Sequence, residues 1–407
     1  MFVMEKKDKS KEDKIYKRHI RFWKIAKVII GPFLKLIYKF SYEIAPKIDG
    51  AYLVLSNHNT DLDPALVALS FPRQMYFVAS EHVYRAGFIS KVLHYVFEPI
   101  AKIKGSSDAL TVMKTIRTLR SGKNVCIFPE GNRSYNGKTG TIIESTGKLV
   151  KAAGVSLVTY KLEGGYFTTP RWGFGIRRGK MHGSVVNIYS PEQIKQMDPK
   201  EITEVIVKDL AENAYERQNE NPIQYKGKKL AEGLECAISV CPVCKKIDTL
   251  QTHKDSVSCK ECGTSTKIDS YGNFLPDFNF RTVEEWDSWQ DEFYAEYYKS
   301  CDSETILFSD ENVCVNTVTS EHETKNVGSG KICMYKEKFV FEGGENTIEF
   351  DLNQISDMSI YGRKTLVFTD GTGAHYEVKS EKLINARKYL SIYNHKKDTL
   401  YQNLKQF

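Results

Sequence analysis

The feature that most constrains the fold of this 407-residue chain is an alternation of apolar runs and helical patterns between residues 51 and 217. The runs predicted to be buried strands are Ala51–Ser56, Met75–Ala79, Asn124–Phe128, Val155–Leu162 and Val185–Tyr189. The predicted helices are Pro64–Phe71, Thr111–Arg120 and, after an N-cap at Asp198, Pro199 to about Arg217. This alternation predicts an α/β fold, with a mainly parallel sheet flanked by helices.

A candidate catalytic base stands where the first predicted strand ends. His58 follows the run Tyr52–Leu55, and α/β sheets place their ligands at this end of a strand. Asp63, five residues later, could hydrogen-bond one imidazole nitrogen and leave the other free as a base. Two ordinary interpretations stay open. Asp63 precedes Pro64 and an apolar run, as an N-cap residue does, and His58 alone could be a simple loop histidine.

A second polar turn, Phe128–Ser134, follows another predicted strand. Gly131 allows the backbone to pass close to a ligand, and Arg133 can grip a phosphate with two parallel hydrogen bonds. Glu130 can hold Arg133 or a substrate hydroxyl. By itself this stretch is also consistent with an ordinary turn.

Together, Asn57–Asp63 and Phe128–Ser134 resemble the glycerolipid acyltransferase family, which contains the bacterial 1-acylglycerol-3-phosphate acyltransferases. In that family Asn-His, four residues and Asp are followed, about 70 residues later, by Phe-Pro-Glu-Gly-Thr-Arg-Ser. The resemblance spans roughly residues 45–215. It implies that His58 is the general base and Asp63 its partner. It also implies a glycerol-phosphate site that comprises Glu130, Gly131 and Arg133.

The resemblance also predicts a basic phosphate contact between these two motifs. We align Lys104 with that position, although Lys102 also fits. Asn132 replaces the usual Thr and keeps the position polar. The fourth motif of the family usually contains a Pro, which Leu157–Tyr160 lacks, so no functional residue is carried over from there.

The reaction implied by the resemblance transfers an acyl group to the sn-2 hydroxyl of 1-acylglycerol-3-phosphate, a lysophosphatidic acid, to give phosphatidic acid. His58 would take the hydroxyl proton, and the oxygen would attack the thioester of acyl-CoA or an acyl carrier protein without an acyl-enzyme intermediate. The alternatives are an acyltransferase for another lysolipid or glycolipid, and an inactive membrane adaptor. The intact motif residues favour an enzyme.

Two Cys-x-x-Cys pairs indicate a separate metal module. Cys241 and Cys244 are separated by 14 residues from Cys259 and Cys262, which is a spacing typical of structural Zn²⁺ ribbons. A redox dithiol or four free thiols are the alternatives. Residues 241–266 have four lysines against three acidic residues, a poor electrostatic footprint for nucleic acid. We therefore expect a structural or docking role and no nucleic-acid partner.

The basic charge of the chain is concentrated at its N-terminus. The net charge is +7, and residues 1–40 hold twelve basic and four acidic residues. An amphipathic helix is predicted for Ile15–Phe40, with a kink or a division at Gly31-Pro32. Its apolar face could pack on the catalytic domain, but the surrounding Lys and Arg favour an anionic membrane surface. We expect a peripheral or monotopic protein on the cytoplasmic face of the cell membrane, without a simple spanning helix.

The last third of the chain changes from helical to β-like patterning. Thr282–Lys299 is predicted to be a helix, and short strand-like runs fill residues 304–378 before a closing helix at Lys382–Tyr393. This pattern predicts a small barrel or sandwich that resembles pleckstrin-homology-like domains in outline. The predicted domains are 1–44 (membrane-interface helices), 45–235 (acyltransferase), 236–272 (zinc ribbon), 273–300 (linker helix) and 301–407 (C-terminal β domain).

Overall fold

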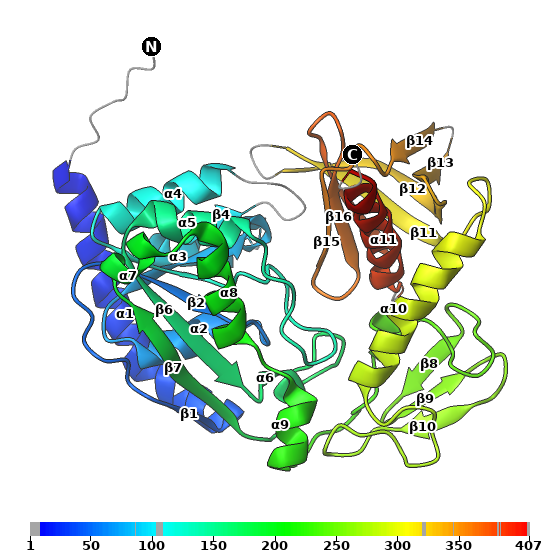
Figure 1. The fold of residues 1–407 in the computed structure, drawn as a ribbon, viewed down its shortest axis with the longest axis horizontal. Coiled ribbons are helices and arrows are strands. Elements are labelled where there is room, and N and C mark those ends of the chain that lie inside the picture. Colours follow the sequence, from blue (N-terminus) through cyan, green and yellow to red (C-terminus); the bar gives the residue numbers. More distant parts are fainter. Residues whose placement is uncertain are drawn as a thin grey trace.

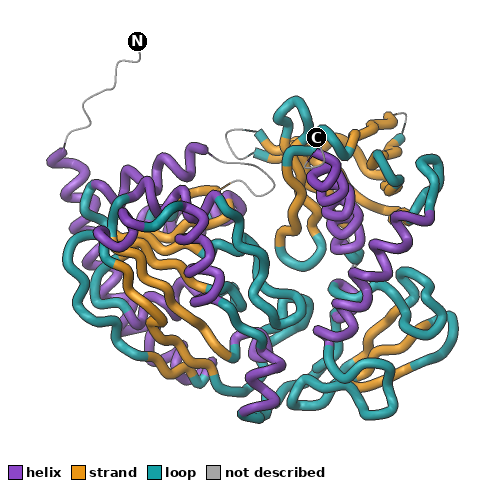
Figure 2. Tube along the Cα trace, in the orientation of Figure 1, coloured by secondary structure: helices purple, strands orange, loops and turns teal. Residues whose placement is uncertain are grey.

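The computed structural model describes residues 9–85, 87–102, 109–319, 323–344, 346–380, 382 and 384–404. Its first half is built on a seven-stranded sheet of order β1-β7-β6-β2-β5-β3-β4 (Figures 1 and 2). The strands are β1 (Phe40–Tyr42), β2 (Tyr52–Ser56), β3 (Met75–Ser80), β4 (Ile100–Lys102), β5 (Asn124–Ile127), β6 (Ser156–Glu163) and β7 (Met181–Tyr189). All neighbouring strands are parallel except β6 and β7, so the predicted mainly parallel sheet is confirmed.

Helices cover both faces of this sheet. They are α1 (Lys9–Tyr38), α2 (Asp63–Ser70), η1 (Glu81–Arg85), α3 (Phe88–Phe97), α4 (Ala109–Arg120), α5 (Ser145–Ala153), α6 (Gly165–Thr168), α7 (Pro191–Gln196), α8 (Pro199–Leu210) and α9 (Ala214–Glu220). Successive residues of β2 serve opposite faces. Val54 belongs to the core shared with α1 and α2, whereas Leu53 and Leu55 belong to the core shared with α4, α5 and α8. The helix predicted up to Arg217 is instead two helices, because Asn213 caps a new one.

The N-terminal helix α1 is continuous through Gly31 and Pro32, so the predicted division there is wrong. Packing explains the continuity, because Leu34 and Tyr38 beyond the proline are buried in the core of the sheet domain. The opposite face of α1 stays exposed and apolar. No helix among the described residues is both long enough and apolar enough to cross a membrane.

Two smaller units follow the sheet domain. The cysteine-rich segment forms an antiparallel sheet of β8 (Leu250–His253), β9 (Ser256–Cys259) and β10 (Ser265–Lys267). Helix α10 (Val283–Ser300), which the sequence predicted, is capped by Thr282 and runs between this small sheet and the C-terminal domain (Figure 1). The Nε1 of Trp286 donates to the Val240 carbonyl at 3.0 Å, which fastens α10 to the cysteine-rich segment.

The C-terminal domain is a seven-stranded antiparallel sheet of order β14-β13-β12-β11-β17-β16-β15, followed by α11 (Ala386–Leu404). Its strands are β11 (Phe308–Val318), β12 (Thr324–Met334), β13 (Lys338–Gly343), β14 (Asn346–Asp351), β15 (Asp357–Tyr361), β16 (Thr365–Thr369) and β17 (His375–Ser380). The closing helix is confirmed, although it begins at Ala386. Of the predicted barrel or sandwich, the barrel is wrong, because among the described residues β14 and β15 are the two edges of one open sheet, and α11 side chains such as Tyr389 and Ile392 fill the core.

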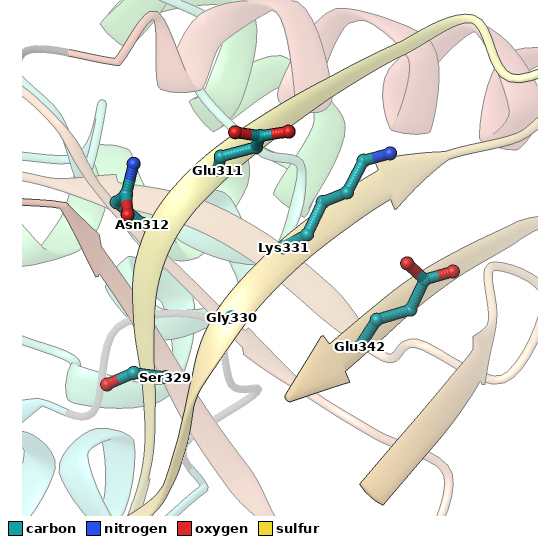
Figure 3. Close-up of a pocket in the computed structure, with 6 residues that line it drawn as sticks. All are labelled: Glu311, Asn312, Ser329, Gly330, Lys331 and Glu342. Atoms are coloured by element: carbon teal, nitrogen blue, oxygen red, sulfur yellow. The ribbon is translucent and has the colours of Figure 1, made fainter. Parts of the chain in front are cut away.

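A hollow of about 400 Å³ lies on the C-terminal sheet (Figure 3). It adjoins the irregular register between Asp310 and Val313 of β11. A Cβ at Gly330 would lie 1.9 Å from the Glu342 carbonyl oxygen, so this close strand contact requires glycine. The hollow is lined by Glu311, Asn312, Ser329, Gly330, Lys331 and Glu342.

Candidate active site and cysteine cluster

The structure brings His58 and Asp63 together in the loop between β2 and α2. The His58 Nδ1 lies 2.9 Å from Asp63 Oδ2, and the Asp63 side chain is fully buried while 21% of the His58 side chain is exposed. The His58 ring also stacks on Phe128, with ring centroids 4.5 Å apart. Within the described residues the other ring nitrogen, Nε2, has no hydrogen-bond partner. The imidazole is therefore fixed in orientation and presents one free nitrogen.

Asp63 does not act as the N-cap of α2, so that alternative is wrong. The helix begins at Asp63 itself, and its N-cap residue, Leu62, makes no side-chain cap. The carboxylate instead turns back into the loop and accepts from the Asn59 and Thr60 amides, at 2.6 and 2.9 Å. The Thr60 hydroxyl donates to the second oxygen at 2.6 Å. An ionised carboxylate can only accept hydrogen bonds, so the His58–Asp63 contact assigns the imidazole proton to Nδ1.

The Phe128–Ser134 turn is hydrogen-bonded directly to the His58 loop. The His58 amide donates to Glu130 Oε1 at 2.7 Å, and the Ser134 amide donates to the His58 carbonyl at 3.1 Å. Gly131 has a φ of +67°, a left-handed conformation that favours glycine, and its amide donates to the Phe128 carbonyl. The turn and the candidate base therefore form one hydrogen-bonded unit.

Glu130 makes backbone contacts that the sequence did not predict, and its contact with a substrate hydroxyl stays a prediction. Its two carboxyl oxygens accept from the amides of His58 and Gly140, so it joins three backbone segments instead of holding Arg133. Burial raises the pKa of Glu130 to about 8, while these two amide donors act in the opposite direction. The Glu130 side chain in this position fixes the start of the turn.

Of the two predicted phosphate contacts, Arg133 and Lys104, the structure describes only Arg133. The Arg133 guanidinium lies 3.4 Å from the Asp61 carboxylate, an exposed residue of the His58 loop. This contact places a positive charge at the rim of the loop that holds the candidate base. Lys104 lies outside the described residues, and the alternative, Lys102, is the last residue of β4.

A contact that the sequence did not predict is made by Arg171. It is 3% exposed, and its guanidinium donates to the Arg133 carbonyl at 3.1 Å and to the Asn132 side-chain oxygen at 3.3 Å. The same guanidinium donates to the carbonyls of Ile360 and Gly362, at 2.7 and 3.0 Å, in the C-terminal domain. Arg171 lies between Pro170 and Trp172 in a loop, and no local sequence pattern marks it.

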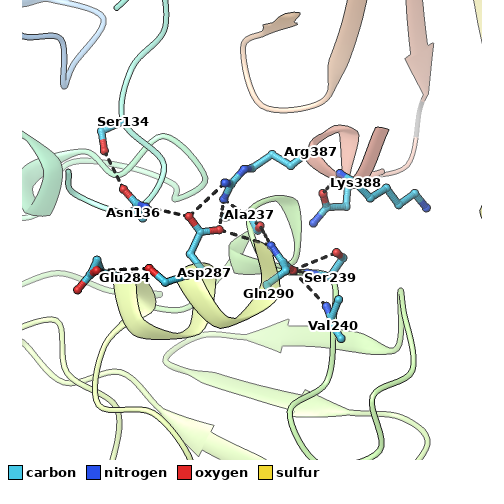
Figure 4. A network of polar contacts seen from close by, with 12 residues as sticks. Ser134, Asn136, Ala237, Ser239, Val240, Glu284, Asp287, Gln290, Arg387 and Lys388 are labelled. Carbon is cyan, nitrogen blue, oxygen red and sulfur yellow. Dashed lines mark hydrogen bonds and ion pairs between the residues drawn. The ribbon is translucent and has the colours of Figure 1, made fainter. Parts of the chain in front are cut away.

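Asn136, two residues after the Phe128–Ser134 turn, is linked to helices α10 and α11, as Figure 4 shows. The Asn136 amide group donates to Asp287 Oδ2 of α10 at 2.9 Å, and Arg387 of α11 forms an ion pair with the same carboxylate. The Asp287 side chain is 1% exposed. A buried, charge-assisted network thus connects the turn to the C-terminal half of the molecule.

The four predicted cysteine ligands converge on one point. Cys241 and Cys262 have sulfurs 3.6 Å apart, and Cys244 and Cys259 have sulfurs 3.8 Å apart, and all four lie within 4.8 Å of one another. A tetrahedral Zn²⁺ ion with Zn–S bonds of about 2.3 Å separates its sulfurs by about 3.8 Å. The cluster therefore fits a metal ion held by four thiolates.

Comparison with known proteins bears on the first of these two sites. Residues 38–163 match the acyltransferase family model. The chain is 26% identical over 132 residues to a 1-acyl-sn-glycerol-3-phosphate acyltransferase of Borreliella burgdorferi, covering 32% of this chain and 51% of the relative. It is 26% identical over 168 residues to a chloroplastic one of Arabidopsis thaliana, covering 41% of this chain and 46% of the relative.

Among solved structures, the 1-acyl-sn-glycerophosphate acyltransferase of Thermotoga maritima shares 20% identity and a TM-score of 0.36, covering 51% of this chain and 84% of that one. The chain spans about half the length of the curated relatives that it matches. The family match includes both the His58 loop and the Phe128–Ser134 turn, which is called the Arg133 turn below. The family match and the two curated relatives therefore support the resemblance of this part of the chain to glycerolipid acyltransferases.

Proposed function

We propose that the chain transfers a fatty acyl group from acyl-CoA or an acyl carrier protein to the sn-2 hydroxyl of 1-acylglycerol-3-phosphate, giving phosphatidic acid. The observation that carries the proposal is the His58–Asp63 pair hydrogen-bonded to the Arg133 turn, in a segment similar to acyltransferases. The names of the two relatives supply the acceptor class.

The free Nε2 of His58 takes the proton of the acceptor hydroxyl in this mechanism. The oxygen attacks the thioester carbonyl, the carbon–sulfur bond breaks, and the departing thiolate receives the proton from His58. Buried Asp63 holds the imidazole in the required tautomer and stabilises its charged form. The acceptor supplies the nucleophile, so no acyl-enzyme is required.

The Arg133 guanidinium is the group proposed to bind the acceptor phosphate. Its planar fork can form two parallel hydrogen bonds to phosphate oxygens. Among the described residues the guanidinium forms an ion pair with the exposed Asp61 at 3.4 Å, a contact weak enough for a phosphate to displace. Gly131 keeps the turn compact beside it, and Lys104 remains the proposed second phosphate contact.

The four-cysteine cluster is proposed to hold a structural Zn²⁺. Four thiolates occupy all four coordination positions of a tetrahedral Zn²⁺ ion, so no position is left for a catalytic water or a substrate. Such an ion would hold the two Cys-x-x-Cys turns around Cys241 and Cys259 together and support the small sheet next to α10.

An anionic membrane surface is the proposed working place, on the cytoplasmic face of the cell membrane. Val28, Ile29, Phe33 and Leu36 on α1 are 62 to 78% exposed, and α3 continues the apolar surface through Phe88, Val92 and Tyr95. The two helices meet where the rings of Phe22 and Tyr95 lie 6.2 Å apart. The exposed basic side chains beside this surface are Arg21, Lys24 and Lys35. Each basic residue near an anionic surface contributes about 1 kcal/mol.

Vesicle binding tests the membrane part of this proposal. The double substitution Phe33→Asp and Leu36→Asp alters only exposed positions, so the fold should persist. We expect it to abolish co-sedimentation with vesicles that contain anionic phospholipid. Leu275→Asp, also at an exposed apolar position but in the cysteine-rich half, is the matched control and should still bind. Equal binding by both variants would refute this membrane surface.

The experiment that tests the reaction is an acyl-transfer assay with purified full-length protein. It combines acyl-CoA and acyl carrier protein donors with acceptors that have a phosphate (lysophosphatidic acid), a larger headgroup, or no phosphate. We expect phosphatidic acid as the main product. Faster transfer to the acceptor without phosphate would exclude the proposed role of Arg133, and transfer to none would exclude the enzyme.

A further inference from the structure

We propose that Arg171 is a positioning residue through which the C-terminal β domain holds the phosphate-binding turn in its active shape. This inference rests on the proposed function, because it concerns how that turn is kept ready for the acceptor. It assigns a catalytic contribution to a domain that lies outside the segment similar to acyltransferases, which ends at residue 163.

The contacts of Arg171 divide between the two domains. On one side the guanidinium donates to the carbonyl of Arg133 and to the side chain of Asn132. On the other it donates to the carbonyls of Ile360 and Gly362, at the end of β15. Its face also lies 4.1 Å from the centroid of the Tyr135 ring. One planar group with five donors can bridge two backbones in this way.

Because the Arg171 guanidinium is buried, its N–H donors must find acceptors within the protein. Burial lowers the pKa of Arg171 to about 10, so the group still carries its charge at neutral pH. A buried guanidinium is stable only when carbonyl and side-chain oxygens satisfy its donors. The carbonyls of Arg133 and Gly362 are therefore held in fixed positions relative to each other, and the direction of the Arg133 side chain follows from its backbone.

An independent contact joins the same two segments. The Asn132 amide group donates to the Ser359 hydroxyl of β15 at 3.1 Å. Asn132 stands where the resembled family usually has Thr, and a threonine has no amide to span Arg171 and Ser359 together. The departure from the family motif thus coincides with the position that contacts the additional domain.

The structure predicts a specific kinetic signature for loss of this bridge. Arg171→Gln removes the charge and leaves the His58–Asp63 pair untouched, so the KM for lysophosphatidic acid should rise about tenfold with the donor KM unchanged. Ser359→Ala, which removes one hydroxyl, should raise the acceptor KM about two- to fivefold.

Matched controls separate positioning from stability. Arg177→Gln removes another buried arginine of the same loop, whose guanidinium donates to the Leu230 carbonyl at 2.6 Å. Ser356→Ala removes a hydroxyl of the C-terminal domain whose hydrogen bond, among the described residues, goes to the Thr369 carbonyl. Both controls should keep the wild-type acceptor KM, even if Arg177→Gln lowers the melting temperature.

Hydrogen exchange gives a readout that does not depend on activity. Amides of residues 128–136 should exchange faster in Arg171→Gln and Ser359→Ala than in wild type, with no change in the two controls. Unchanged exchange in this turn, or an acceptor KM that rises equally in Arg171→Gln and Arg177→Gln, would overturn the inference. If wild type transfers no acyl group, the proposed function fails, and exchange in the turn alone decides whether Arg171 positions it.

Discussion

The two halves of the candidate active site are held in place by different means. The Asp63 carboxylate that orients His58 is held locally, since its hydrogen bonds among the described residues go to positions three to five residues away. The Arg133 turn is held at Asn132 and Asn136 by Ser359 and Asp287, which lie 227 and 151 positions away. The carboxylate that orients the base is therefore held locally, whereas the phosphate-binding turn, which also contacts the His58 backbone, is held in addition by the C-terminal half of the molecule.

Because of this difference, substitutions in the two regions should affect two different steps, proton transfer and acceptor binding. A change inside the His58 loop should act on proton transfer and hence on turnover. A change in the C-terminal half should act on the Arg133 turn and hence on acceptor binding. A change in the His58 loop that raises the acceptor KM, or a change in the C-terminal half that lowers turnover alone, would contradict this division.

The largest expected effect comes from Asp63→Asn. The substitution removes the charge that holds the Nδ1–H tautomer of His58, and turnover should fall about 10²-fold or more with the acceptor KM little changed. Asp209→Asn is the matched control. Asp209 is another buried carboxylate of the same domain, and it accepts from Thr159 and Asn187. Comparable losses of turnover in both variants would show that loop stability, and not tautomer control, was measured.

A smaller effect is expected from Arg133→Gln, which tests the other half of the site. A hydrogen bond to a charged group contributes about 1.5–3 kcal/mol, so the KM for the phosphate-bearing acceptor should rise about ten- to a hundredfold. Steady-state kinetics with each substrate varied in turn measures this change. An equal rise in the donor KM would contradict the phosphate role of Arg133.

Metal removal tests whether the four-cysteine cluster, which lies outside the candidate active site, affects acceptor binding. The four-cysteine cluster supports α10, and α10 holds the turn through Asp287, so chelation should raise the acceptor KM about two- to tenfold. Cys259→Ser should do the same and lower the zinc content measured by mass spectrometry. Cys301→Ser, at a free cysteine outside the cluster, should do neither. A loss of turnover without a change in acceptor KM would contradict the proposed coupling.

The smallest expected effect is a pH dependence of the interface between the domains. His82 of η1 lies 2.8 Å from Glu377 of β17. Burial lowers the pKa of His82, but hydrogen bonds to Glu377 and Glu81 outweigh it and raise the pKa overall. Burial raises the pKa of Glu377, but hydrogen bonds to His82, Lys379 and Arg85 outweigh it and lower the pKa overall.

These directions set the sign of the effect. The contribution of His82 is fully present below its unfolded pKa of about 6.5 and is lost as pH rises through the higher folded value. The contribution of Glu377 is lost only in acid, as pH falls below the ordinary carboxyl range. Thermal unfolding should therefore show a loss of stability above pH 6.5 that disappears in His82→Gln. The same pH profile in His82→Gln and in a His182→Gln control would contradict this assignment.

Features set by local sequence were predictable, whereas contacts between domains were not. The parallel sheet, the His58–Asp63 pair and the cysteine cluster were predictable, because periodicity, a five-residue spacing and paired Cys-x-x-Cys turns are local signals. Arg171 and Asp287 were not, because their partners come from other domains. The contact of Glu130 with the His58 amide was not predicted either, because sequence spacing alone does not reveal such a backbone partner, and its role in ligand binding stays a prediction. The open C-terminal sheet was also missed, since strand pattern does not show which edges pair.

The role of His58 as general base is tested by phosphatidic acid formation from lysophosphatidic acid and an acyl thioester by purified wild type and His58→Ala. Loss of a general base should lower turnover by about 10²–10⁴-fold while the melting temperature and acceptor binding persist. We predict product with wild type and that loss with His58→Ala. Near-normal turnover in folded His58→Ala would contradict the account.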